Sequence, residues 1–172
     1  MAPGRVIDAV AEPVGERIVP EPASPVGQVL SRMAQAERGF QPGNFLAGAE
    51  TAFRMIVAAF AAGDRVMLRN LLSDETYRGF EGAIAAREAA GETQHTDIKA
   101  IPTAAIEQAE LRGQMALITV RFVSDQVNLT NGRAGTPVAG ADAMTEITDL
   151  WTFERELGAA DPTWRLVAAR SA

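Results

Sequence analysis

Apolar residues in the first half of the chain recur every three or four positions, which is the spacing of one face of a helix. The strongest stretch, FLAGAETAFRMIVAAFAAG, predicts a helix over about 44–62 that ends at Gly63, where the chain can turn into a left-handed conformation. Asp64 and Ser73 are typical helix caps, so each predicts one further helix. The first half of the domain is therefore expected to be helical.

A shorter amphipathic helix is predicted ahead of these, over 25–38. Ser24 caps it, Pro25 takes the first helical position, and Leu30 and Met33 lie on its apolar side. Its polar side has no lysine and mixes basic with acidic residues, so direct binding to anionic lipid is not expected. The apolar side is expected to pack on its own domain or on a second copy of the chain, which leaves a homodimer open.

From Thr93 onward the period changes to two, which is typical of strands. Two strands, TQHTDIKAI and TAAIEQAEL, are predicted before a tight turn at RGQ. The next strand, MALITVRFVSDQVNL, places Ile118, Val120 and Phe122 on one face. A glycine-rich connection, TNGRAGTPVAGA, then leads to the strands MTEITDLWTFERE and TWRLVAA. The second half is expected to be an antiparallel meander.

Helices that precede strands in this way predict an α+β domain, in which the helices pack on one face of a curved antiparallel sheet. Long strands twist and curl, so such a sheet commonly leaves a concavity beneath its helices. Residues 1–24 are rich in proline and predict a flexible linker, with an arm packed on the domain as the alternative. Residues 25–42 form the amphipathic helix and its connector, and 43–172 form the globular domain.

Composition and charge exclude several classes of chemistry. The 172 residues include no cysteine, so disulfides, a thiolate nucleophile and cysteine-ligated metals are excluded. His95 is the one histidine and lies in a polar stretch, so we expect it to be exposed, and we expect neither a metal nor a cofactor. The formal net charge of −6 argues against a nucleic-acid partner.

No stretch is expected to span a membrane. The longest apolar run, MIVAAFAAG, is shorter than the roughly 20 residues that a spanning helix needs. The first residues lack the basic-then-apolar pattern of a signal peptide. The chain as given is expected to be soluble, and whether its N-terminus has been trimmed is left open.

The stretch TDLWTFER puts a carboxylate among aromatic residues. Alternate residues of a strand share a face, so Asp149 points to the same side as Trp151 and Phe153. Arg121 on the preceding strand would make Asp149 a structural anchor, whereas burial without a partner would raise the pKa of its carboxyl. A catalytic role would need Tyr77 beside Asp149 as a proton donor, as in a small isomerase or dehydratase.

Three blocks of the sequence resemble the Tim44-like domain family, the C-terminal domain of a peripheral subunit of the mitochondrial inner-membrane import translocase. They are FLAGAETAFRMIVAAFAAGDRVMLRNLLSDETYRGFEGAI, ITVRFVSD and ITDLWTFERELGAADPTWRLVAA, and they look closest to the alphaproteobacterial branch. The resemblance implies a fold similar to nuclear transport factor two, with an apolar pocket. It also implies a non-enzymatic module at the bacterial inner membrane, anchored by an N-terminal segment that this chain does not include.

The same resemblance implies that part of the aromatic set lines a pocket, with an ordinary filled core as the alternative. The candidate pocket residues are Phe53, Ile56, Phe60, Tyr77, Phe80, Ile84, Phe122, Trp151 and Phe153, with Asp149 and Arg121 as the polar pocket or anchor residues. The leading hypothesis is a module that binds a lipid acyl chain or a hydrophobic protein segment, with the inner membrane or membrane proteins as partners. The alternative is a small pocket enzyme that uses Asp149 and Tyr77.

Overall fold

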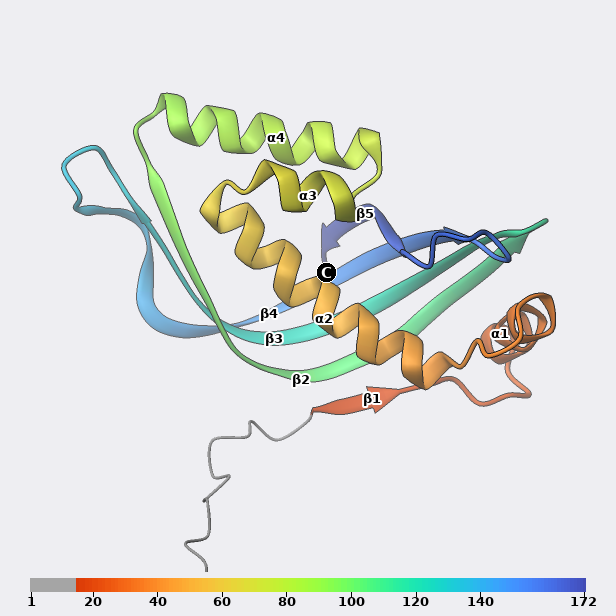
Figure 1. Cartoon of the computed structure of the whole chain (residues 1–172). Coiled ribbons are helices and arrows are strands. Elements are labelled where there is room, and N and C mark those ends of the chain that lie inside the picture. Colours follow the sequence, from red (N-terminus) through yellow and green to blue (C-terminus); the bar gives the residue numbers. More distant parts are fainter. Residues whose placement is uncertain (1–14) are drawn as a thin grey trace, which may run out of the picture.

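The computed structural model describes residues 15–172, apart from the side chains of residues 141 and 142. Within that range a short strand precedes four helices, and four longer strands follow them (Figure 1). The elements are β1 (Glu16–Ile18), α1 (Pro25–Ala36), α2 (Pro42–Ala62), α3 (Arg65–Leu71), α4 (Asp74–Ala89), β2 (Thr93–Arg112), β3 (Met115–Asn131), β4 (Pro137–Glu156) and β5 (Arg165–Ser171). This order confirms the α+β class.

The predicted helix boundaries are confirmed by their caps. The side chains of Ser24, Asp64 and Ser73 each accept a hydrogen bond from the backbone N–H three residues later. These bonds satisfy amide groups that have no partner inside the first turn of a helix. Gly63 ends α2 with a φ of 73°, a conformation that costs glycine little.

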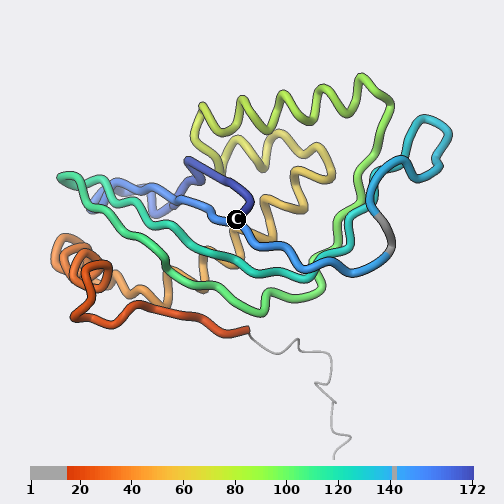
Figure 2. Tube along the Cα trace, turned by 180° about the vertical axis from the view of Figure 1, so that it is seen from behind, coloured from red at the N-terminus to blue at the C-terminus, as the bar shows by residue number. Residues whose placement is uncertain are grey.

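The strands form one sheet in the order β1-β2-β3-β4-β5. Strands β2 to β5 are antiparallel neighbours, and β1 runs parallel to β2. Figure 1 shows α2 across the concave face of this sheet, with α3 and α4 beyond it and α1 at one end. Seen from behind in Figure 2, the long strands curve around the helices. The side of the sheet that faces the helices is the inner face below.

Two strand boundaries differ from the sequence prediction. The two strands predicted at 93–101 and 103–111 are one strand, β2, whose pairing with β3 is interrupted between Ala100 and Thr103. Pro102 lies within this irregularity, where its missing N–H costs no ladder hydrogen bond. Strand β4 begins at Pro137, inside the predicted glycine-rich connection, because that stretch pairs with the end of β3.

The prediction of a flexible linker over 1–24 is wrong for the segment that begins at Gly15 and continues through β1. Glu16–Ile18 pairs with β2, and the Arg17 guanidinium bonds the buried carboxylate of Glu50 on α2, with 2.7 Å between Nε and Oε2. Gly15 lies so close to the carbonyl of Ile101 that a side chain could not fit there. Residues 1–14 lie outside the described part of the chain.

Helix α1 packs on its own domain. Leu30 and Met33 are buried in the same core as α2 and the sheet, which confirms the prediction for that side of the helix. Helix α2 is 21 residues long and its most apolar 18-residue stretch has a mean hydropathy of 1.5, so, contrary to the sequence expectation, it is long and apolar enough to cross a membrane. The core helix of a globular domain passes the same test, and α2 buries Phe53 and Ile56 in this core.

Candidate functional site

A cavity of about 630 Å³ opens between the inner face of the sheet, the second half of α2 and the first half of α4. Its apolar wall includes Ile56, Val57, Phe60, Phe80, Ala83, Ile147 and Trp151, and its polar wall includes Gln94, Thr96, Gln126, Asn128 and Asp149. The cavity therefore has a carbon-rich side provided mainly by the helices and a hydrogen-bonding side provided by the strands.

Two other hollows have different linings. A cleft of about 730 Å³ beside the start of β2 is lined by charged side chains such as Arg87 and Glu88 and by small or apolar ones such as Ala58 and Leu129. A groove of about 470 Å³ lies between the α1–α2 connection, α2 and the β4–β5 connection, and includes Phe45 and Trp164. Of these three hollows, the cavity over the sheet is the one that Asp149 lines. It is also lined by more of the predicted pocket residues than either of the other two.

The register of the sheet explains how Asp149 reaches the cavity. Phe122 of β3 lies opposite Asp149, and Val120 lies opposite Trp151. Both β3 residues are fully buried beneath the helices, so their partners on β4 face the same side. Asp149 therefore projects from the inner face, as its place beside Trp151 in the sequence predicted.

The expected pairing of Asp149 with Arg121 is wrong. Arg121 alternates with the buried residues of β3 and so points to the outer face, where its Nε bonds the Glu107 carboxylate at 2.7 Å. Within residues 15–172, no hydrogen bond or ion pair reaches the half-buried Asp149 carboxylate. Loss of hydration without a compensating partner raises the pKa of Asp149.

The structure divides the predicted pocket residues into two groups. Ile56, Phe60, Phe80 and Trp151 line the cavity together with Asp149. The others, Phe53, Tyr77, Ile84, Phe122 and Phe153, are buried in the hydrophobic core and do not line it. Trp151 belongs to both regions, because its ring lies 4.6 Å from that of Phe53 between centroids while it borders the cavity.

Tyr77 and Asp149 do not form the pair that the enzyme alternative requires. Tyr77 is buried, and the guanidinium carbon of Arg69 lies 4.2 Å from the centroid of its ring. Its neighbours on α4, Glu75, Thr76 and Gly79, line the cavity, but Tyr77 itself does not. The cavity therefore lacks the tyrosine donor beside a carboxylate on which that alternative depends.

Sequence reasoning missed the polar wall of the cavity, which is a continuous chain of hydrogen bonds across β2 and β3. Gln126 donates to the Ser124 hydroxyl at 2.8 Å, and Asn128 donates to the Gln126 carbonyl at 3.1 Å. Thr96 then donates to Asn128 at 2.6 Å, and Gln94 donates to Thr96 at 3.1 Å. The sequence did contain a signal for this wall. The alternating row of inward-facing residues on β3 continues past Phe122 with polar residues.

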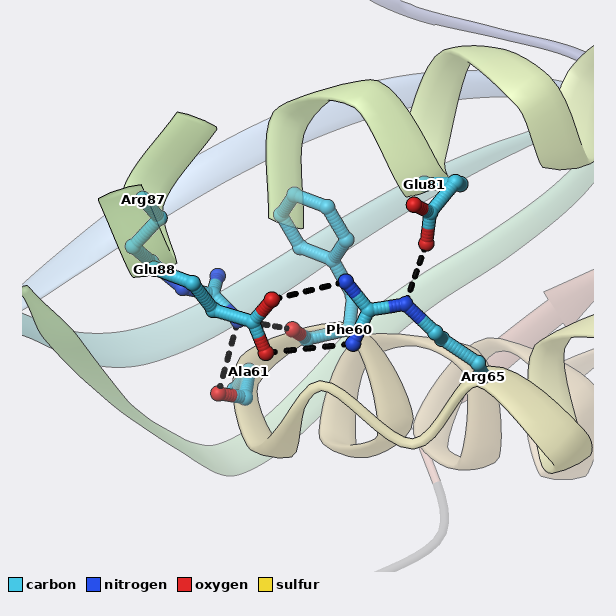
Figure 3. Close-up of polar contacts among 6 residues, drawn as sticks. All are labelled: Phe60, Ala61, Arg65, Glu81, Arg87 and Glu88. Atoms are coloured by element: carbon cyan, nitrogen blue, oxygen red, sulfur yellow. Dashed lines mark hydrogen bonds and ion pairs between the residues drawn. The ribbon is translucent and has the colours of Figure 1, made fainter. Parts of the chain in front are cut away.

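Arg87 joins this chain to the end of α2. It donates to the Gln94 side-chain carbonyl at 2.9 Å. It also donates to the backbone carbonyls of Phe60 and Ala61 at 2.8 and 3.2 Å (Figure 3). Its guanidinium carbon also lies 5.2 Å from the centroid of the Phe60 ring, which forms part of the apolar wall. Arg87 therefore positions one residue in each wall of the cavity.

A second arginine fastens α3 to α4. Arg65, at the start of α3, bonds the carboxylates of Glu81 and Glu88, and the Glu88 carboxylate takes two of its N–H groups (Figure 3). These hydrogen bonds from Arg65 hold the pKa of Glu88 below its usual range. The network fixes α3 to α4, and α4 covers the cavity.

His95 is exposed, as predicted, and no group of three metal-ligating side chains occurs within the described residues.

A sequence model of the family described as "Tim44-like domain" matches residues 26–171. A search of curated proteins found no match. Among solved structures, the fold is similar to the crystal structure of the intermembrane space region of the chloroplast protein ARC6, with a TM-score of 0.54 at 10% sequence identity. The similarity covers 73% of this chain and 95% of that one. At this identity the likeness concerns the fold alone.

Proposed function

The chain belongs to the Tim44-like domain family, and from that premise we propose that it is a non-enzymatic, membrane-associated module that binds a hydrophobic ligand in protein translocation or membrane-protein handling. The occupant is a lipid acyl chain or a hydrophobic protein segment. The site of action is the bacterial inner membrane, and anchoring depends on a segment outside this chain. Partners are the membrane or its proteins.

The observation that carries this proposal is the cavity over the sheet. Its volume of about 630 Å³ lies within the range of small-ligand sites, and side chains such as Ile56, Phe80 and Trp151 give it a carbon-rich wall. Burial of apolar ligand surface on that wall supplies the driving force, at roughly 25 cal/mol per Å². The residues predicted for catalysis do not converge there, which favours binding over turnover.

Two glycines of α4 offer a matched test. Gly79 lines the cavity and Gly82 does not, and a Cβ at either position would meet open space. Replacing each with leucine changes helix propensity by the same amount, so stability is expected to change equally. Only the Gly79→Leu side chain enters the cavity.

The measurement is a titration with Nile red, an uncharged apolar dye, followed by its fluorescence. We expect Gly79→Leu to weaken binding by at least about tenfold and Gly82→Leu to bind as the wild type does. Equal binding by all three proteins would refute the cavity as the binding site. Native mass spectrometry of the protein purified from its host would then identify the natural occupant of the site.

A further inference from the structure

The charged groups of the cavity are unevenly placed. Glu75 of α4 and Arg170 of β5 line the cavity as exposed residues, whereas Asp149 is half-buried. On the inner face Asp149 stands between Ile147 and Trp151 along β4, opposite Phe122 of β3 and Ser171 of β5, so its neighbours in the sheet are apolar except for Ser171. The most deeply placed charge in the cavity is therefore a carboxylate.

This carboxylate lacks a partner in the described part of the chain, and such a group is unfavourable in a half-buried apolar setting. A cation inside the cavity would provide the missing charge and hydrogen-bond donors. An anion would be repelled at the same place, because charges a few ångströms apart interact strongly where water is partly excluded. The cavity therefore favours an occupant with a positive charge over one with a carboxylate or phosphate.

The polar wall indicates what kind of molecule carries that charge. A side-chain amide has two N–H donors and two carbonyl lone pairs, and the chain of bonds through Gln126 and Asn128 uses only part of this capacity. The remaining capacity of this cavity-lining wall matches the N–H and C=O groups of a peptide backbone. A hydrocarbon chain would leave the same groups without partners, at a cost in free energy.

We propose that the occupant of the cavity is an apolar polypeptide segment with a lysine or arginine side chain, and that the Asp149 carboxylate pairs with this cation. The inference rests on the proposed function, since it names the occupant of the same site. Asp149 then selects the ligand by its charge, while the apolar wall contributes affinity for any apolar segment.

The test uses three capped, apolar heptapeptides that differ only at the central position, where they carry lysine, norleucine or glutamate. Norleucine keeps the hydrocarbon stem of lysine and lacks the charge. Binding is measured by calorimetry to the wild type, to Asp149→Asn and to Asp125→Asn. The last variant is a matched control, because it makes the same change from aspartate to asparagine on the outer face of the sheet.

For the wild type, we expect the lysine peptide to bind at least about tenfold more tightly than the norleucine peptide, and the glutamate peptide to bind most weakly. In Asp149→Asn the lysine and norleucine peptides are expected to bind equally. Asp125→Asn should retain the wild-type preference. The preference should also shrink as salt is added, because it is electrostatic.

Equal affinity of the wild type for lysine and norleucine peptides, or a lysine preference that persists in Asp149→Asn, would overturn the inference and leave the proposed function intact. Dodecylamine and dodecanoate test a lipid-like source of charge. If dodecylamine binds in an Asp149-dependent manner and no peptide binds, the occupant is a small amphiphile and the inference is wrong. If no peptide, amphiphile or Nile red binds, both the inference and the proposed function fail.

Discussion

Replacing Arg87 with methionine should destabilise the domain by breaking the contact between α2, α4 and the sheet. The guanidinium bonds two carbonyls at the end of α2 and the side chain of Gln94. Hydrogen bonds to a charged group contribute about 1.5–3 kcal/mol, and a cation at a helix C-terminus adds about 0.3–1 kcal/mol. Since Arg87 is half-buried and the carbonyls can recover water, we expect a loss of about 2–3 kcal/mol.

Methionine keeps most of the aliphatic stem, so the contact with Phe60 is largely retained and the effect reports the polar bonds. For a domain of this size the expected fall in melting temperature is roughly 4–12 °C, measured by circular dichroism. Arg112→Met is the control, because that arginine pairs with Glu110 on the surface and its loss should leave the melting temperature unchanged. An Arg87→Met melt within about 2 °C of the wild type would refute the reasoning.

Three further substitutions test charges and packing at the cavity and at the ion pair between Glu37 and Arg155. Because burial raises the pKa of Asp149, its ionised form opposes folding above that pKa; Asp149→Asn should raise the melting temperature at pH 7 by up to about 4 °C, and the difference should vanish in acid. Arg155 and the Gly158 amide lower the pKa of Glu37, so its stabilisation is present above its ordinary pKa of 4.5 and is lost as the pH falls through the lowered value. In melts from about pH 7 to 3, Glu37→Gln should therefore show a shallower loss of stability than the wild type, and an equal slope would contradict the ion pair. Trp151→Ala should cost about 3 kcal/mol, the low end for a buried tryptophan because one side borders the cavity, and should weaken Nile red binding; full retention of dye affinity would exclude it from the site.

The helical half of the fold was predictable because its signals are local. Ser24, Asp64 and Ser73 cap their helices through bonds to amides three residues away, and Gly63 turns the chain within a single residue. Such contacts depend on a few neighbouring residues, so the sequence carries them directly. Strand ends are set by what lies beside them in space, which explains why the start of β4 was missed.

The N-terminal strand could not be predicted for the same reason. The three residues of β1 are too few to show a strand period, and they form a strand because they pair with β2 from Thr103 to Ala105. The ion pair between Arg17 and Glu50 joins residues 33 positions apart. The residues near Arg17 in the sequence give no sign that Glu50 will lie beside it. The proline-rich composition around β1 therefore led to the prediction of a flexible linker.

The error over Arg121 was avoidable from the sequence. Ile118, Val120 and Phe122 were predicted to share the buried face of β3, which already places Arg121 on the other side. Asp149, predicted to lie on the face of Trp151, could then never meet it across a regular ladder. A register inferred from both strands together would have left Asp149 without a partner.

The position of the cavity follows from the lengths of the elements. The 17 residues of β3 extend roughly 56 Å, whereas the 21 residues of α2 extend about 32 Å, so one helix cannot cover the inner face of the sheet. The inner row of β3 is apolar as far as Phe122 and turns polar at Ser124, Gln126 and Asn128. Arg87 bonds both Gln94, which continues this polar row, and the carbonyls at the end of α2. The inner face therefore changes from apolar to polar near the point where α2 ends. Helix α4 spans the remaining sheet from a distance that leaves the cavity open beneath it. A hollow with one apolar and one polar wall is thus the consequence of a sheet longer than its covering helix, and Asp149 lies at the boundary between the two.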